Sequence, residues 1–225
     1  MEPRRVDYTG DGLAEAQLLA TPYAQVKAWV DDAVRRAEQG PDVVEPHAMS
    51  VATVDAHGSP SVRTVLMRFL DARGPGFVTD TTSRKGRDLA ANPAVAASLV
   101  WPAMYRAIRF RGRAVPLERE AVEAYFGARP WASRISAWAS RQSEPIGSRD
   151  ELEAQYARRA EQFPDRGGPG DVPVPDSWGG YRITCDEVEL WAGRRNRLHD
   201  RIVYSRVGPG DLDDAPSWAV SRRQP

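Results

Sequence analysis

Basic side chains gather at one expected helix start in this sequence, in a pattern that could bind a phosphate group. The segment Thr81-Thr82-Ser83-Arg84-Lys85-Gly86 follows an expected strand and opens an expected helix, so free backbone N–H groups and two cations converge there. Arg63 lies between apolar residues in another expected strand and is a further cation. The alternatives are an ordinary capped helix with solvated basic residues and an edge-strand arginine.

A second basic group lies near the C-terminus, in the run Arg197-Leu198-His199-Asp200-Arg201. If this run opens a strand, alternation places Arg197, His199 and Arg201 on one face. Two guanidinium groups and an imidazole repel one another unless an anion or a carboxylate joins them. The run therefore favours a ligand site, with a solvated strand end as the alternative.

A third group combines a phenol, a guanidinium and a hydroxyl. Tyr125, Arg129 and Ser133 are spaced i, i+4 and i+8, which would form one stripe on a continuous helix, although Pro130 is expected to break it. Such a stripe suits an anion. The rim of an amphipathic helix gives the same spacing.

Periodicity identifies the elements that must hold these groups in place. Thr21-Pro22 marks the start of an amphipathic helix that ends near Gly40-Pro41. From residue 49 the period changes to two, and a hairpin over 50–54 and 62–67 is expected. Further strands are expected at 76–80, 95–101, 108–115, 181–191, 198–207 and 217–221, with helices at 83–91, 118–128, 130–140 and 148–163.

This order of elements predicts a mainly β protein with helices, of the α+β class, whose antiparallel sheet curls or closes. No βαβ alternation and no GxGxxG motif of a dinucleotide-binding fold is present in the sequence. We expect a polar N-terminal arm over residues 1–20 and a single domain over 21–225.

Composition excludes several classes of function. Basic and acidic residues number 31 each, so no net field favours nucleic acid or an anionic membrane. No stretch approaches the roughly 20 apolar residues of a membrane span. Cys185 is the only cysteine and the three histidines show no metal-ligand spacing, so we expect a soluble, cytoplasmic protein without an internal disulfide or a metal.

Five blocks of the sequence, in order, closely resemble the pyridoxine/pyridoxamine 5'-phosphate oxidase family. They are RTVLMRF (63–69), SRKG (83–86), YFGARPWASRISAWASRQS (125–143), VPDSWGGYRI (174–183) and ELWAGRRNRLHDR (189–201). The resemblance implies an FMN-binding split β-barrel with flanking helices, which forms a homodimer with FMN at the interface.

The resemblance also implies roles for individual residues. Contacts to FMN are expected from Arg63, Thr64, Val65, Arg68, Val78, Thr79, Arg84, Lys85, Gln142, Ser143, Trp191 and Arg201. The substrate phosphate is expected to meet Arg68, Tyr125, Arg129 and Ser133, while Arg197 and His199 hold the substrate ring and act as the catalytic pair.

Two positions depart from the family pattern. Arg68 stands where the family has a lysine, and Ala107 stands where it has a glutamine beside the flavin ring. Arg68 keeps the charge in a chain whose only lysines are Lys27 and Lys85, but a guanidinium fork is not equivalent to an ammonium. Both departures bear on substrate identity more than on flavin binding.

The resemblance implies oxidation of pyridoxine or pyridoxamine 5'-phosphate to pyridoxal 5'-phosphate, with dioxygen reduced to hydrogen peroxide. One alternative is an oxidase of another aromatic ring, similar to the phenazine-biosynthesis flavin oxidases. The other is a non-catalytic module that binds flavin or pyridoxal phosphate, which the retained Arg197 and His199 disfavour. The expected partners are a second copy of the chain and a small-molecule substrate.

Overall fold

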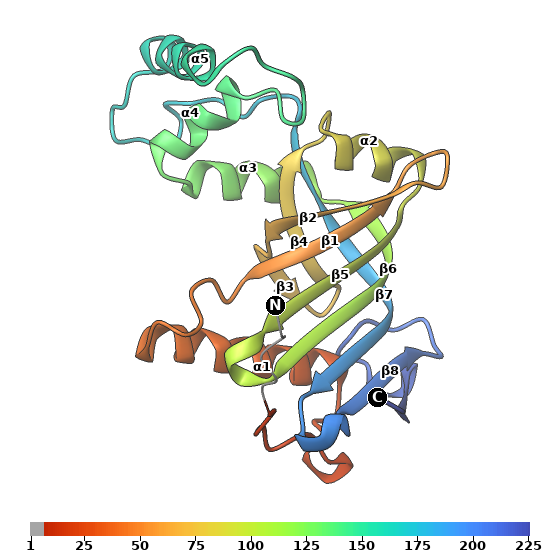
Figure 1. The fold of residues 1–225 in the computed structure, drawn as a ribbon. Helices are drawn as coiled ribbons and strands as arrows, with labels where there is room; N and C mark the ends of the chain where they lie inside the picture. The colour runs from red at the N-terminus through yellow and green to blue at the C-terminus, as the bar shows by residue number, and fades with distance from the viewer. Residues whose placement is uncertain (1–6) are drawn as a thin grey trace.

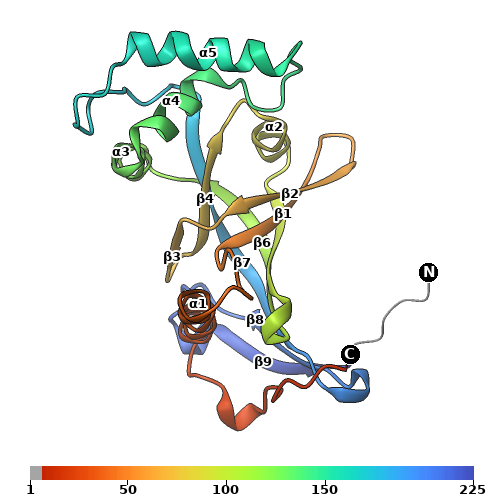
Figure 2. The ribbon, with the colours of Figure 1, turned by 60° about the vertical axis from the view of Figure 1, so that its left-hand side comes forward.

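The long strand β7 (Trp178–Ala192) organises the sheet of this protein (Figure 1). In the computed structural model, which describes residues 7–225, β7 pairs with β6 (Arg106–Pro116) along its length. On its other side the first part of β7 pairs with β4 (Gly74–Asp80), and its last part pairs with β8 (Asp200–Arg206). The strand thus joins two halves of the molecule (Figure 2).

All strand pairs are antiparallel, and the remaining strands extend the sheet outward from β7. The sheet order is β2-β1-β5-β6-β7-β4-β3, with β8 and β9 continuing from the end of β7. The outer strands are β1 (Ala48–Val54), β2 (Pro60–Leu66), β3 (Phe69–Asp71), β5 (Ala94–Trp101) and β9 (Trp218–Arg223). This arrangement leaves β2 at one edge of the sheet.

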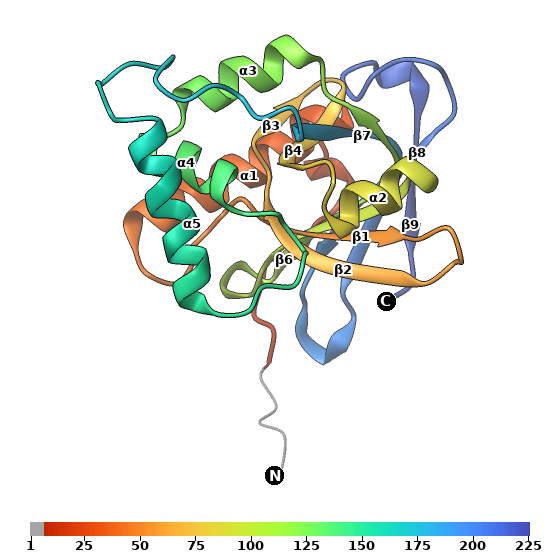
Figure 3. The same cartoon turned by 90° about the horizontal axis from the view of Figure 1, so that it is seen from above.

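Helices lie at both ends of the curled sheet (Figures 1 and 3). Helix α1 (Pro22–Gln39) packs at one end; the Thr21 side chain caps it by accepting from the Ala24 N–H, and Val26 and Trp29 are buried in the main core. At the other end lie α2 (Arg84–Ala91), α3 (Arg119–Ala128), α4 (Trp131–Ala139) and α5 (Arg149–Gln162). Short 3-10 turns occupy Glu15–Gln17, Pro102–Met104, Arg195–Arg197 and Ala215–Ser217.

The helical layer formed by α3, α4 and α5 has a small core of its own. Phe126, Ile135 and Val172 are its buried centre, separate from the main core between the sheet and α1. The guanidinium of Arg134 donates to the carbonyl oxygens of Gly168 and Pro169, which fastens the loop between α5 and β7 to α4. The small core and these hydrogen bonds therefore hold α3, α4, α5 and the loop together as one layer beside the sheet.

The structure confirms the mainly β architecture with helices, and each expected helix is present within two residues of its expected ends. Two strand predictions need correction. Strand β3 was not expected, and the strand expected over 198–207 begins only at Asp200. Among residues 7–225, no helix is both long and apolar enough to cross a membrane.

Candidate active site

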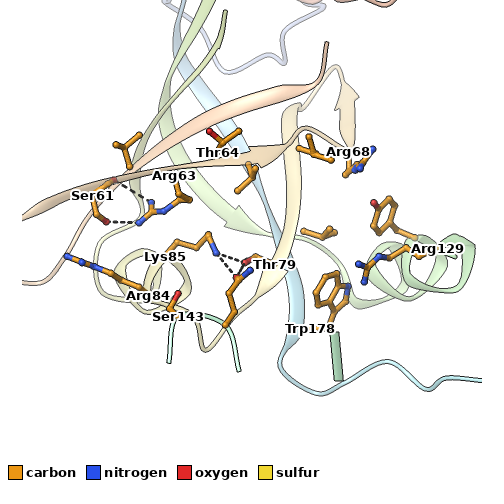
Figure 4. A pocket seen from close by; sticks show the side chains of 16 residues that line it. Ser61, Arg63, Thr64, Arg68, Thr79, Arg84, Lys85, Arg129, Ser143 and Trp178 are labelled. Atoms are coloured by element: carbon orange, nitrogen blue, oxygen red, sulfur yellow. Dashed lines mark hydrogen bonds between the residues drawn. The ribbon is translucent and has the colours of Figure 1, made fainter. Parts of the chain in front are cut away.

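A pocket of about 580 Å³ lies between the edge strand β2, strand β4, the start of α2 and the end of α3 (Figure 4). Its wall includes most residues expected to bind FMN and three of the four expected to bind the substrate phosphate. The lining residues are Ser61, Val62, Arg63, Thr64, Val65, Leu66, Arg68, Val78, Thr79, Arg84, Lys85, Tyr125, Arg129, Gln142, Ser143 and Trp178.

The first group of cations in this pocket consists of Arg63, Arg84 and Lys85. Arg84 and Lys85 occupy the first turn of α2, whose N-terminal N–H groups are partly free to bind an anion. Ser83 caps this helix, and its Oγ accepts from the N–H of Gly86. Gly86 lets the turn approach the end of β4 closely, because a Cβ there would overlap the carbonyl oxygen of Thr81.

Lys85 is a buried cation whose hydrogen-bond partners within residues 7–225 are all neutral. Its Nζ donates to Gln142 Oε1 at 2.6 Å, to Thr79 Oγ1 at 2.9 Å and to Ser83 Oγ at 3.3 Å. Burial, and then the neighbouring charge of Arg63, lower the pKa of Lys85 from its usual 10.5 to about 8. A buried ammonium without a carboxylate is suited to neutralise an anionic ligand.

Arg63 belongs to edge strand β2, but its side chain is only 20% exposed because it turns toward the pocket and β1. Its terminal nitrogens donate to Thr53 Oγ1 at 2.7 Å and to Ser61 Oγ at 2.6 Å, and more weakly to the carbonyl oxygen of Val51 at 3.2 Å. The Nε–H makes no hydrogen bond to the described residues. Arg63 is therefore an edge-strand arginine whose side chain lies against the pocket and β1 and is mostly shielded from solvent.

The second group of cations consists of Arg68 and Arg129, beside Tyr125. Figure 4 shows Arg68 and Arg129 at the opposite end of the pocket from Arg63, Arg84 and Lys85. The guanidinium carbon of Arg129 lies 4.5 Å from the ring centre of Trp178. Burial lowers the pKa of Arg129, and the charge of Arg68 lowers it further.

Among residues 7–225, five cationic side chains and no carboxylate line the pocket. Uncompensated positive charge in a half-enclosed site favours anionic ligands, and its division between two ends favours two separate anionic groups. Ser133 is the one member of the expected substrate set from this region that does not line the pocket. It lies in α4, after the break at Pro130.

The remaining predicted site residues lie elsewhere in the chain, near the end of β7. Trp191 and His199 have ring centres 4.7 Å apart, and His199 Nδ1 accepts from the N–H of Arg194 at 3.0 Å. Burial lowers the pKa of His199, with a further contribution from Arg197. These residues and Arg201 do not line the pocket.

The alternation argument for Arg197, His199 and Arg201 was wrong. The strand begins only at Asp200, so Arg197 and His199 precede it and do not alternate with Arg201. Arg197 instead ends the 3-10 turn Arg195–Arg197, where it is exposed and has a positive φ of 61°. Arg201 is paired with the buried carboxylate of Glu189 at 2.6 Å. Burial raises the pKa of Glu189, but the hydrogen bonds and charges of Arg201 and Arg109 outweigh this and lower it.

This second cluster is distant from the pocket because the two lie at opposite ends of one strand. Trp178 of the pocket wall is the first residue of β7, and Trp191 is the last but one. At about 3.3 Å per residue, thirteen residues of strand span on the order of 40 Å. The ring centre of Tyr8 lies 5.2 Å from that of His199 in the second cluster.

Residues that sequence reasoning missed include Ser61 and Trp178, which line the pocket, and Asp88 behind it. No local signal marks them, because each matters only through contacts with segments distant in sequence. Ala107, one of the two departures from the family pattern, is buried and is the cross-strand neighbour of Trp191. It therefore belongs to the second cluster, whereas Arg68 belongs to the pocket.

Comparison with known proteins gives a consistent result over nearly the whole chain. Residues 30–163 match the family model described as pyridoxamine 5'-phosphate oxidase, and residues 178–225 match that of the pyridoxine 5'-phosphate oxidase C-terminal dimerisation region. A pyridoxine/pyridoxamine 5'-phosphate oxidase of Kineococcus radiotolerans is 47% identical over 223 residues, which are 99% of this chain and 97% of that protein. One of Streptomyces avermitilis is 45% identical over 221 residues, covering 98% and 94%.

Among solved structures, PhzG from Burkholderia lata 383, in complex with tetrahydrophenazine-1-carboxylic acid, is similar to this chain with a TM-score of 0.82. The two are 28% identical in sequence, and the match covers 96% of this chain and 100% of that one. An FMN-binding protein from Nostoc punctiforme, related to pyridoxamine 5'-phosphate oxidase, shares the fold with a TM-score of 0.67 at 18% identity.

Proposed function

Because this chain belongs to the pyridoxamine 5'-phosphate oxidase family of flavin-dependent oxidases, we propose that it uses FMN to oxidise pyridoxine or pyridoxamine 5'-phosphate to pyridoxal 5'-phosphate. The resemblance seen in the sequence is confirmed at the level of the family. The observation that carries the proposal is a pocket without carboxylates that has a cationic group at each end. FMN carries one phosphate group, and the substrate, pyridoxine or pyridoxamine 5'-phosphate (the vitamin ester), carries the other.

The residues at the start of α2 fit the phosphate of FMN. Arg63, Arg84 and Lys85 supply three positive charges, and the free N–H groups of the first helical turn supply donors directed at the same point. Lys85 has no carboxylate partner among the described residues, so a bound phosphate would supply the missing counter-charge. Thr64, Val65, Val78, Thr79, Gln142 and Ser143 line the wall that would continue along the cofactor.

The second cationic group would hold the phosphate of the substrate. Arg68, Arg129 and the Tyr125 hydroxyl lie together at the far end of the pocket, and stacking on Trp178 fixes the plane of the Arg129 guanidinium. Binding energy from the phosphate, which does not react, can then orient the ring that does. We assign Ser133 the same role only through the family pattern, since it does not line the pocket.

Bound FMN would supply an acceptor for the hydride lost from the C4' carbon, and dioxygen would take the two electrons and two protons as hydrogen peroxide. The alcohol gives the aldehyde directly, whereas the amine gives an imine that water hydrolyses with release of ammonia. The residues of the protein would bind the flavin and the substrate and orient the two rings relative to each other. Arg197 and His199 would hold the pyridine ring, with the His199 Nδ1 engaged by the Arg194 N–H and its Nε2 left to face the ligand. Trp191 and Arg201 would contact the flavin.

These four residues could reach the pocket only from a second subunit, because in one chain they lie at the far end of β7. We therefore propose a homodimer in which the end of β7 and the start of β8 of one subunit complete the pocket of the other. The match of residues 178–225 to a dimerisation region supports this arrangement, since Trp191, Arg197, His199 and Arg201 all fall within it.

A phenazine-type oxidase is the second candidate. The TM-score of 0.82 to PhzG and the departures at Arg68 and Ala107 favour it. Sequence identity of 47% to a pyridoxine/pyridoxamine 5'-phosphate oxidase, against 28% to PhzG, favours the vitamin ester. The second cationic group also favours a phosphate over a substrate without one.

The test compares pyridoxine 5'-phosphate with pyridoxine on one preparation of the FMN-loaded protein under oxygen, with aldehyde and hydrogen peroxide as readouts. We expect kcat/KM to be at least about a hundredfold higher for the phosphate ester, a difference of about 2.7 kcal/mol. The ratio cancels errors in flavin loading. A ratio near one would contradict the vitamin ester as substrate and leave the phenazine-type oxidase as the better account.

A further inference from the structure

A buried carboxylate lies behind the first cationic group and does not line the pocket. Asp88, in the second turn of α2, is only 5% exposed. Its Oδ2 accepts from the hydroxyl of Thr53 on β1 at 2.6 Å and from the hydroxyl of Ser61 on β2 at 3.0 Å. The side chain thus connects α2 to both strands of the β1–β2 hairpin.

The same two hydroxyl groups also accept hydrogen bonds from Arg63, so they link Asp88 to the Arg63 guanidinium. An ionised carboxylate can only accept hydrogen bonds, so Asp88 draws the hydroxyl protons of Thr53 and Ser61 toward itself. The two hydroxyl oxygens then present lone pairs to the guanidinium of Arg63, which donates to them at 2.7 Å and 2.6 Å. Figure 4 shows the bond between Ser61 and Arg63 at the edge of the pocket.

We propose that Asp88 is a positioning residue for the cofactor phosphate, acting through Thr53 and Ser61 to set the Arg63 side chain and to hold α2 against the hairpin. The cradle of Arg63, Arg84 and Lys85 is drawn from these two elements, so its spacing depends on their contact. The inference rests on the proposed use of FMN. It adds a residue outside the pocket on which FMN affinity depends.

Position and charge predict opposite effects when Asp88 is removed. The carboxylate is 3.7 Å from the nearest Arg63 nitrogen and adds negative charge close to the cradle. If charge alone mattered, its removal would strengthen the binding of an anion. If Asp88 positions Arg63, its removal weakens binding although a repulsive charge has been lost.

The experiment measures the Kd of FMN by quenching of flavin fluorescence and the melting temperature of the FMN-free protein, for the wild type and five variants. We expect Asp88→Ala to weaken FMN binding at least about tenfold, because both hydroxyls lose the acceptor that orients them. Asp88→Asn should stay within about threefold, since an amide oxygen in the place of Oδ2 still accepts both bonds. Val30→Ala in α1 is the control for a loss of stability far from the pocket.

Thr53→Val tests the same route without touching Asp88 or the pocket wall, in case Asp88→Ala does not fold. It should weaken FMN binding severalfold, and Thr53→Ser, which keeps the hydroxyl, should restore it. Equal or tighter binding by Asp88→Ala would overturn the proposal, as would equal or tighter binding by Thr53→Val if Asp88→Ala does not fold. The proposal would also fail if Asp88→Asn bound FMN as weakly as Asp88→Ala does. It would fail as well if Val30→Ala lowered FMN affinity as much as Asp88→Ala does for the same drop in melting temperature.

The proposed function fails separately from this inference. A wild-type protein that does not bind FMN would refute the use of this cofactor before any variant is compared. A wild type that binds FMN, together with an Asp88→Ala protein that binds it equally well, refutes only the role of Asp88.

Discussion

The ammonium group of Lys85 is buried among neutral hydrogen-bond partners, and this makes its charge sensitive to pH. Its pKa in the folded protein is about 8, compared with an ordinary value of 10.5. Between these two values the unfolded chain holds the proton and the folded chain does not. The free energy of unfolding therefore increases as pH rises from about 8 to about 10.5, because the folded protein no longer carries the buried charge of Lys85. Below about pH 8 this charge lowers the free energy of unfolding by its full amount.

We expect FMN affinity to change in the opposite direction, because the phosphate needs the charged form of Lys85. The Kd of FMN should rise above pH 8, by at most about tenfold per pH unit while a single proton is involved. Flavin fluorescence titrations from pH 7 to pH 10 provide the measurement. Lys85→Arg keeps its charge throughout this range and should show a flatter profile. Identical profiles for the two proteins would show that another group controls binding.

Arg68 is the departure from the family that lies inside the pocket, beside Arg129. Arg68→Lys should keep kcat/KM for pyridoxine 5'-phosphate within about tenfold, or 1.4 kcal/mol, because either cation can neutralise the ester. Arg68→Met should lower it by more than that and leave the kcat/KM for pyridoxine unchanged. Equal losses on both substrates would mean that Arg68 does not contact the phosphate.

At the scale of the element, the start of α2 shows why a glycine follows the two cations. Gly86 faces the carbonyl oxygen of Thr81, and a Cβ there would have to push the helix away from the end of β4. Gly127 in α3 is a matched contrast, since a Cβ there would make an ordinary contact of 3.5 Å with Pro169. Both residues are helical, and only their surroundings differ.

Gly86→Ala should therefore destabilise the protein by about 1–3 kcal/mol through overpacking and should also weaken FMN binding by displacing Arg84 and Lys85. Gly127→Ala should be neutral or slightly stabilising, since alanine is the better helix former by about 1 kcal/mol. Thermal unfolding without FMN and FMN titration measure the two effects. If Gly86→Ala binds FMN as the wild type does, the close approach of α2 to β4 has no bearing on the cofactor site.

At the scale of the whole molecule, the predicted site residues form two clusters at opposite ends of β7. The pocket carries Arg129, and the distant cluster carries Arg197 and His199. A symmetric dimer offers two copies of each cluster, so each complete site would draw one cluster from each subunit. This arrangement can be tested by mixing two inactive variants.

Arg129→Ala and Arg197→Ala should each lose at least about tenfold in activity as homodimers. When the two are unfolded and refolded together, half of the dimers contain one subunit of each kind, and each of these has one intact site. We expect recovery of about a quarter of wild-type activity, compared with at most about a tenth when each variant is refolded alone. No recovery, despite mixed dimers seen by mass, would place both residues of a site in the same subunit.

Most helices and strands, and the chemical types of the site residues, could be predicted from local patterns in the amino-acid sequence. Helix starts at Thr21, Ser83 and Ser148 were predicted because a cap involves only a side chain and the backbone three residues on. The hairpin of β1 and β2 was predicted because alternation and a turn are also local. The cations of the pocket were identified because a charged side chain at a helix start can be recognised from its neighbours.

Which of these residues lie close together depends on the packing of distant segments and could not be predicted from the sequence. Arg68 and Arg129 share a pocket with Arg63 because α3 packs beside the edge of the sheet, whereas Arg197 lies far away at the other end of β7. The late start of β8 and the role of Asp88 were likewise invisible, since both depend on hydrogen bonds between segments distant in sequence. Such contacts arise from how the sheet curls and the helices pack, which local patterns do not specify.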